Sequence, residues 1–228
     1  MRFLSILFLV ITLSSCSTVH NSSITPPKDF DKGNEISAIT AFSPTGLNVS
    51  LAYSPINHLF IHGAINRIGD KPKNYHHNYQ YGIGGYLNFD RFNFETEFGI
   101  GKGNFGWNQF LASGAYYTLE SANGNYDKLY GSFSATFDNA FGITIRYGQT
   151  TSSYSYVESP FETYYPINTP HENIYFGGLL FYKYDTEFGL SFFTTLAVDI
   201  YQGKGIRTNY PFQLGLGIKY NLNFSKKD

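Results

Sequence analysis

The chain alternates between apolar and polar residues with a period of two over most of its length after residue 35. The final segment shows this most clearly, since residues 212, 214, 216, 218, 220, 222 and 224 are all Phe, Leu, Ile or Tyr. A period of two places the two kinds of side chain on opposite faces of a β-strand. Ten segments follow the pattern, at 36–42, 47–54, 58–66, 79–89, 92–100, 129–137, 141–148, 174–184, 188–200 and 212–224. We therefore expect an all-β fold.

The connections between these segments alternate between short and long from the second segment onwards. Short links lie at 54–57, 89–91, 138–139 and 184–187, and longer ones at 67–78, 102–126, 151–172 and 202–210. The link at 43–46 is the exception, because it is short where the pattern allows a long one. Such links join neighbouring antiparallel strands, so we predict an up-and-down β-barrel of ten strands. A miscount within 102–126 would make the number eight or twelve.

The composition favours a sheet whose outer face meets lipid. Charged residues make up only 14% of the chain and aromatic residues 19%, with 23 glycines and a mean hydropathy of -0.23. Soluble domains carry roughly 25% charged residues, whereas membrane strands alternate and so have a moderate average hydropathy. The formal net charge of -1 gives no basic footprint for nucleic acid. With a single cysteine there is no disulfide framework.

The N-terminus has the features of a signal peptide. Arg2 precedes an apolar stretch at 3–12, which is too short for a membrane-spanning helix and is followed by Leu13-Ser14-Ser15-Cys16. This run resembles the lipobox of bacterial lipoproteins. The resemblance implies that residues 1–15 are removed by lipoprotein-processing machinery and that Cys16 is lipidated. An ordinary secretory signal with an incidental cysteine is the alternative. Residues 16–34 are rich in Ser, Thr, Pro and Asn, and we expect them to form a flexible tether.

The last predicted strand ends at Phe224 and resembles the C-terminal aromatic signal of small single-chain outer-membrane β-barrels. The tail at 225–228 departs from that pattern. The resemblance covers residues 35–224 and implies outer-membrane lipid and barrel-assembly machinery as partners. In that family the short turns are periplasmic and the long loops extracellular. Both ends of the barrel would then lie on the periplasmic side, where a lipid on Cys16 would enter the inner leaflet.

The polar face of the predicted strands carries isolated charges among Gly, Ser, Thr and Asn. We expect these charges to face the lumen and to balance one another, because buried charges must be paired. A soluble, lipocalin-like barrel is the alternative, with apolar residues inside and these charges in water. The candidate lumen network is Glu95, Glu97, Arg146, Lys183, Asp199 and Lys219.

Two predicted loops contain candidate chemistry. Asp70, His76 and His77 lie on one loop, and an outer-membrane protease would use Asp and His around an activated water. Adjacent histidines on a strand point to opposite faces and chelate a metal poorly. His62 is expected on the polar face. The loop 151–172 offers a candidate binding surface for sugar, lipopolysaccharide or protein, although it could equally cover the barrel mouth. Its aromatic residues are Tyr154, Tyr156, Phe161, Tyr164 and Tyr165.

The sequence contains no recognisable catalytic, nucleotide-binding or zinc-binding motif, so we predict no cofactor, no metal and no enzymatic activity. Small barrels have lumens largely filled by side chains. We expect a lipid-anchored outer-membrane protein with a structural, surface-binding or narrow-channel role and an unknown ligand. The alternatives are a soluble periplasmic lipoprotein that binds an apolar ligand and a barrel enzyme that acts on lipid or peptide.

Overall fold

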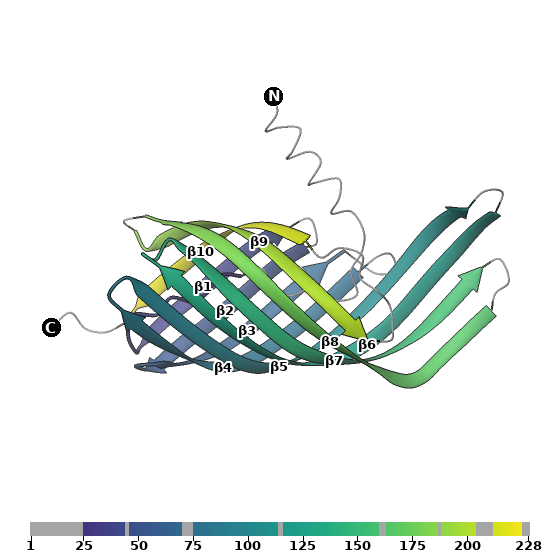
Figure 1. The fold of residues 1–228 in the computed structure, drawn as a ribbon, viewed down its shortest axis with the longest axis horizontal. Coiled ribbons are helices and arrows are strands. Elements are labelled where there is room, and N and C mark those ends of the chain that lie inside the picture. The colour runs from purple at the N-terminus through teal and green to yellow at the C-terminus, as the bar shows by residue number, and fades with distance from the viewer. Residues whose placement is uncertain are drawn as a thin grey trace, which may run out of the picture.

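The protein is a closed antiparallel barrel of ten strands in the order in which they follow along the chain (Figure 1). The structure is a computed structural model and describes residues 25–43, 46–69, 75–113, 116–159, 163–186, 188–203 and 212–224. The strands are β1 (Glu35–Ser43), β2 (Gly46–Ile56), β3 (Leu59–Ile68), β4 (Tyr75–Phe89), β5 (Phe92–Ser113), β6 (Tyr116–Phe137), β7 (Phe141–Ser159), β8 (Thr163–Asp185), β9 (Leu190–Gly203) and β10 (Phe212–Asn223).

The register between strands sets the tilt of the barrel wall. Paired residues on neighbouring strands can be followed around the barrel from Ser191 on β9 through β10, β1 and then β2 to β8. The row returns to β9 at Gly203, so the strands are staggered by twelve residues over one full circuit. A stagger of this size in ten strands corresponds to a tilt of about 40°. Each residue along a strand therefore rises by roughly 2.5 Å along the barrel axis.

One end of the barrel, which we call the turn end, is formed by tight turns. Asp138 and Asn139 both have positive φ, at 50° and 52°, as a type I′ hairpin turn requires. Asp90, in the turn between β4 and β5, also has positive φ. The ends of β1 and β10 meet at this end too, since Glu35 pairs with Asn223. These features confirm the predicted short turns at this end.

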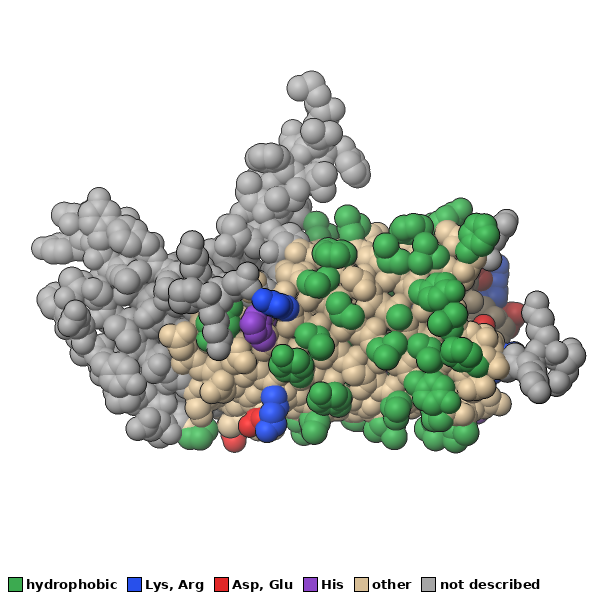
Figure 2. All heavy atoms as spheres, turned by 180° about the vertical axis from the view of Figure 1, so that it is seen from behind, with side chains coloured by type: hydrophobic (Ala, Val, Ile, Leu, Met, Phe, Trp, Pro, Cys, Tyr) green, Lys and Arg blue, Asp and Glu red, His purple; other side chains and the backbone are tan. Residues whose placement is uncertain are grey.

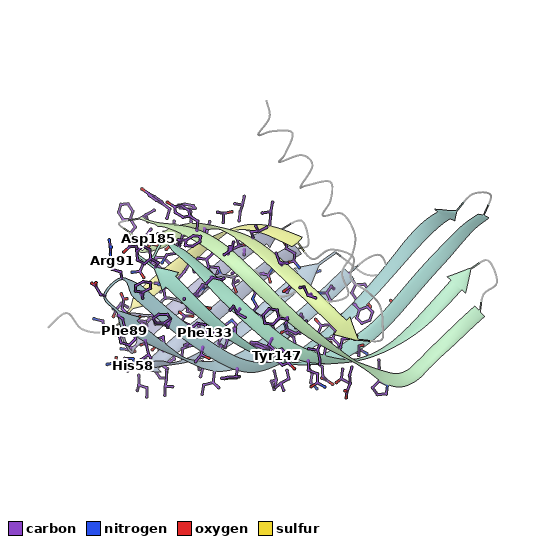
Figure 3. The ribbon with its side chains drawn as sticks, viewed as in Figure 1. His58, Phe89, Arg91, Phe133, Tyr147 and Asp185 are labelled. Carbon is purple, nitrogen blue, oxygen red and sulfur yellow. The ribbon has the colours of Figure 1, made fainter. Side chains whose placement is uncertain are left out.

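Most large apolar side chains of the described strands point outwards, and most polar side chains point into the lumen. A smaller apolar cluster also lies inside, formed by Ile39, Ala41, Leu179, Phe181, Phe193 and Ala197. Large hydrophobic residues such as Phe98, Ile100 and Leu216 are at least 60% exposed, while Glu97 and Lys219 on the other face are buried. Figure 2 shows hydrophobic side chains spread over the barrel wall, with charged side chains near its ends. In Figure 3, Phe89 lies at the turn end near Arg91 and His58, and Phe133 lies further along the wall. The described barrel therefore has no inverted, lipocalin-like arrangement.

Two of the predicted long loops are strands. The pairing between β5 and β6 continues to Ser113 and Tyr116, and the pairing between β7 and β8 continues to Glu158 and Thr163. Both hairpins project beyond the barrel wall opposite the turn end (Figure 1). The apolar alternation fades there, but ladder hydrogen bonds do not depend on it. Trp107 belongs to β5, so its glycine-rich surroundings prolong a hairpin.

The expected flexible tether at 16–34 requires a correction for the part that the structure describes. Residues 26–30 are all buried inside the barrel, and residues 31–34 lead to them from the rim at the turn end. Residues 16–24 lie outside the described ranges. Among the described residues, no helix is long and apolar enough to cross a membrane.

Candidate functional site in the barrel lumen

Residues 25–34, which we call the lumen segment, enter the barrel at the turn end and follow the inside of the wall. At the rim, the Asn34 backbone N–H donates to the Ser54 carbonyl at 2.6 Å, and the Phe224 N–H donates to the Asn34 carbonyl at 3.0 Å. The Gly33 N–H donates to Asn57 Oδ1 at 2.6 Å. A Cβ on Gly33 would lie 2.7–2.8 Å from backbone atoms of Ile56 and Asn57, so only glycine allows this close approach.

Phe30 fixes the lumen segment through an apolar contact just above the rim. Its ring lies 5.6 Å from the rings of both Phe60 and Tyr86, and its side chain is 1% exposed. Ala52 completes this buried cluster. The Asn88 side-chain amide donates to the Phe30 carbonyl at 2.9 Å, so the backbone of the segment is also bound. A buried aromatic ring of this kind contributes a few kcal/mol, or about 3–5 on truncation to alanine.

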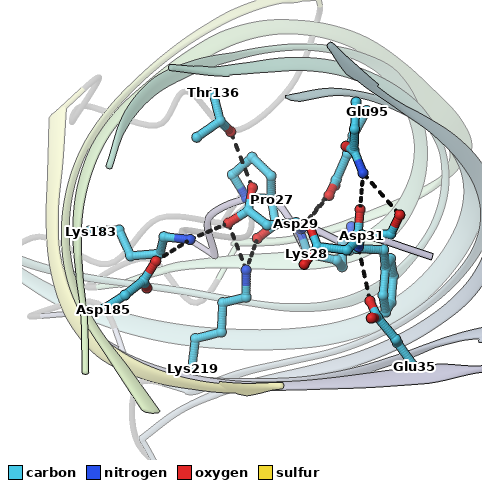
Figure 4. A network of polar contacts seen from close by, with 12 residues as sticks. Pro27, Lys28, Asp29, Asp31, Glu35, Glu95, Thr136, Lys183, Asp185 and Lys219 are labelled. Carbon is cyan, nitrogen blue, oxygen red and sulfur yellow. Dashed lines mark hydrogen bonds and ion pairs between the residues drawn. The ribbon is translucent and has the colours of Figure 1, made fainter. Parts of the chain in front are cut away.

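Asp29 lies between two lysines on the β8–β10 side of the lumen (Figure 4). Its Oδ2 accepts from Lys183 Nζ at 2.9 Å and from Lys219 Nζ at 2.6 Å, and its Oδ1 accepts from Thr136 Oγ1 at 3.2 Å. Lys219 also donates to the Pro27 carbonyl at 3.3 Å. The three charged side chains are each at most 4% exposed, so their attraction is hardly screened by water.

Lys28 points to the opposite wall, where β5 supplies two glutamates. Its Nζ forms an ion pair with Glu97 Oε2, and its backbone N–H donates to Glu95 Oε2 at 3.0 Å. The Asp29 N–H donates to the other oxygen of Glu95 at 2.5 Å. Glu97 Oε1 is hydrogen-bonded to His62 Nδ1 at 2.7 Å. The dipeptide Lys28-Asp29 therefore bridges an acidic wall and a basic wall.

Beside and above the dipeptide, the lumen contains a small cavity of about 50 Å³. It is bordered by Thr25, Pro26 and Pro27 from the segment and by Lys128, Arg146 and other polar residues from the wall. A space of this size holds one or two water molecules. Lys128 Nζ lies 4.9 Å from the centre of the Tyr175 ring, within the range of a cation–π contact.

All six residues of the candidate network are buried in the barrel. The pairing differs from the expectation for four of them, because Glu95, Glu97, Lys183 and Lys219 bind the lumen segment. Lys28 and Asp29 are the partners that the sequence analysis missed. Their signal was visible in the charged stretch at 28–32, but a Pro- and Ser-rich flank suggested a linker. His62 does face the polar side, as expected.

The remaining candidates fall in different places. His76 is on β4 rather than on a loop, and its Nε2 is 2.7 Å from the Tyr126 hydroxyl in the lumen. His77 follows it on the same strand and is half-buried. Asp70 and Cys16 lie outside the described residues. Among those that are described, no group of three His, Cys, Asp or Glu residues is placed to hold a metal ion.

The aromatic residues of the candidate binding surface lie on the β7–β8 hairpin. The backbones of Tyr154 and Tyr156 belong to β7, and those of Tyr164 and Tyr165 to β8, with Tyr156 paired to Tyr165. Phe161 and the side chains of the four tyrosines lie outside the described part of the chain. The loop between these strands is therefore short, and the binding surface stays a prediction.

Solved structures share this architecture. The outer membrane protease OmpT from Escherichia coli matches with a TM-score of 0.55 at 9% identity, covering 90% of this chain and 100% of that chain. The translocator domain of the autotransporter NalP from Neisseria meningitidis gives 0.45 at 10% identity, over 96% and 95%. The N-terminal β-barrel domain of Pseudomonas aeruginosa OprF gives 0.34 at 8% identity, over 84% and 100%. Because the last two scores are below 0.5, they carry no further argument.

The fold is that of the bacterial outer-membrane β-barrels, in a ten-stranded form with a segment of its own chain in the lumen. At such low identity the likeness concerns the fold alone. No protein-family model matches the chain, and no curated protein sequence matches it.

Proposed function

We propose that this protein spans the bacterial outer membrane as a closed barrel and acts at the cell surface rather than as a general pore. The observation that carries the proposal is the lumen segment, because Lys28, Asp29 and Phe30 fill the lumen and bind both walls. A conducting barrel needs a continuous water-filled path, and these three side chains would interrupt such a path. The two projecting hairpins, β5–β6 and β7–β8, are the parts that would meet extracellular ligands (Figure 1).

The apolar exterior supports a membrane-spanning position. On β5, outward-facing apolar side chains begin at Phe92 next to the turn end and continue to Ile100, and Lys102 follows as an exposed charge. At this tilt, the ten steps along the strand from Phe92 to Lys102 rise roughly 25 Å, which matches the apolar band of outer-membrane barrels. Outer-membrane lipid is therefore the partner of this surface, and barrel-assembly machinery would insert it.

Lipidation at Cys16 by lipoprotein-processing machinery remains part of the proposal, supported by the Leu13-Ser14-Ser15-Cys16 run. The proposal assigns no catalytic reaction to the protein. The aromatic hairpin β7–β8, with Tyr154, Tyr156, Phe161, Tyr164 and Tyr165, is the proposed binding surface for an extracellular ligand.

The membrane position is tested with Cys16→Ser carrying an ordinary secretory signal, so that no lipid can hold the protein. We expect it to stay in carbonate-washed outer membranes and to show a heat-dependent shift in gel mobility, since the barrel itself is the anchor. Release of the folded protein into the wash would contradict the membrane-spanning position.

The closed lumen is tested by conductance in planar bilayers. A variant with Lys28→Ser, Asp29→Ser and Phe30→Ser keeps the chain length but removes the large side chains that the lumen segment places in the lower lumen. We expect no steady current through the native protein and small current steps through the variant. Equal steady currents through both would show that the lumen segment does not close the barrel. The double substitution Lys102→Ser and Asp127→Ser, on the outer wall, is the matched control and should show no steady current.

A further inference from the structure

The lumen segment has a direction, and this direction bears on where the mature N-terminus lies. We propose that the chain preceding Thr25 leaves the barrel through the mouth that carries the β5–β6 and β7–β8 hairpins. The mature N-terminus would then lie on the outer side of the membrane. This rests on the proposed function, in which the barrel spans the outer membrane with its tight turns on the periplasmic side.

From residue 34 towards residue 25, the wall residues that the lumen segment contacts lie progressively further from the turn end. Asn34 is bound at the turn-end rim to Ser54 and Phe224. Phe30 lies against Phe60, the second residue of β3. Further in, Lys28 reaches Glu97, which is five residues from the turn end of β5.

The cavity that the first described residues border extends towards the outer edge of the apolar band. Thr25 and the two prolines border the same small cavity as Gln80 and Lys128. Each of these wall residues is nine positions from the turn end of its strand, at Phe89 and Phe137. At about 2.5 Å per residue, the top of this cavity is roughly 23 Å above the turn end, close to the full height of the band.

The local sequence keeps the segment extended in this direction. Pro26 and Pro27 have fixed φ angles, and each proline restricts the residue before it to extended conformations. Thr25, Pro26 and Pro27 therefore form a stiff run that carries the chain away from the turn end rather than reversing it. A run of this kind rises about 3.1 Å per residue.

A return path to the periplasmic side would have to pass the lumen segment a second time. The cavity beside Pro26 and Pro27 measures about 50 Å³, which is enough for water but not for another strand of polypeptide. Below it, Lys28, Asp29 and Phe30 occupy the lumen and contact opposite walls. Within the described barrel, the route with room for the preceding residues is therefore outwards, towards the hairpins.

The chain between Cys16 and Thr25 is long enough for a lipid on Cys16 to reach the outer leaflet. Eight residues separate Cys16 from Thr25, and the nine steps between them can span at most roughly 30 Å, which is enough to reach the outer leaflet from the upper lumen. A lipid on Cys16 would then lie in the outer leaflet, not in the inner leaflet as the sequence analysis expected. The barrel must also close around its own N-terminal segment during assembly, because β1 and β10 pair beside it.

The test is labelling of single cysteines with a membrane-impermeant maleimide, in intact cells and after permeabilisation. The background is Cys16→Ser with an ordinary secretory signal, which has no other cysteine. Thr18→Cys reports on the N-terminal side, with Ser22→Cys as a second position. Ser113→Cys at the end of β5 reports on the hairpin side, and Ser225→Cys after β10 reports on the turn end. Heat-dependent gel mobility confirms that each variant is folded.

We expect the Thr18→Cys and Ser113→Cys variants to be labelled in intact cells to within twofold of their labelling after permeabilisation. The Ser225→Cys variant should gain at least tenfold on permeabilisation. If the Ser113→Cys variant is labelled in intact cells but the cysteines at 18 and 22 require permeabilisation, the outward path is wrong while the membrane orientation stands. If the Ser113→Cys variant itself requires permeabilisation, the orientation of the barrel is wrong and both proposals fall.

Discussion

Asp29 offers the sharpest test of whether the lumen segment is held by charge. It lies on the segment and is the shared partner of Lys183 and Lys219, and all three side chains are buried. We expect Asp29→Asn to destabilise the attachment of the segment. Asparagine keeps the size of the side chain and one acceptor oxygen, so the substitution removes the negative charge without opening a cavity.

The magnitude follows from what remains around each lysine. Lys183 keeps its contact with Asp185 at 3.3 Å, and Asp185 is about half exposed. Lys219 is fully buried and keeps the Pro27 carbonyl at 3.3 Å. Removing one partner from a buried ion pair costs about 3–5 kcal/mol. Because the introduced asparagine amide would still accept one hydrogen bond, we expect the lower end, about 3 kcal/mol, which is a change of roughly a hundredfold in an equilibrium constant.

Trypsin provides the assay, since Lys28 is buried in the native protein and becomes a cleavage site only when the segment leaves the lumen. When opening and closing are fast relative to cleavage, the rate of cut at Lys28 reports the population of the open form. We expect Asp29→Asn to be cut there about a hundred times faster than the native protein. Urea unfolding in lipid vesicles measures whether the barrel as a whole loses the same free energy.

Asp185→Asn is the matched control, because it removes the other carboxylate that contacts Lys183 from a half-exposed position. Exposed pairs contribute about 0–1 kcal/mol, so its cleavage rate should change by less than about tenfold. A cleavage rate for Asp29→Asn equal to that of Asp185→Asn would refute the reasoning. It would mean that packing around Phe30 alone holds the segment.

Three further predictions concern other parts of the molecule. Phe30→Ala should lower the free energy of attachment by about 3–5 kcal/mol, because it leaves a cavity against Phe60 and Tyr86, and the trypsin assay would detect it. Gly33→Ala should lower the free energy of unfolding in urea by about 1–3 kcal/mol, because its Cβ would clash with the backbone of Ile56 and Asn57. Gly178→Ala is the control, since a Cβ there meets nothing within 4 Å, and it should lower the free energy by less than about 0.5 kcal/mol. Replacing both members of the exposed Lys102–Asp127 pair by Ser should leave the free energy of unfolding in urea unchanged within about 1 kcal/mol. A larger loss would mean that the pair is shielded from water.

Local sequence patterns were enough to predict the wall of the barrel. Strand number, turn positions and the outward direction of residues such as Ile100 and Leu216 follow from a period of two, because neighbouring side chains on a strand must point to opposite faces. The burial of charges such as Glu97 and Lys219 followed from the same alternation. The lengths of β5 to β8 did not, because ladder hydrogen bonds continue where the apolar alternation stops.

The partners of the lumen charges were decided only by the tertiary structure. Lys28 and Asp29 stand in a stretch whose composition resembles a linker, and nothing in its local pattern shows that it is buried. Their partners come from β5, β8 and β10, so Lys28 and Glu97 are 69 positions apart and Asp29 and Lys219 are 190 apart. Closure of the sheet buries these side chains together in the lumen, where an ion pair is strong and an unpaired charge is costly.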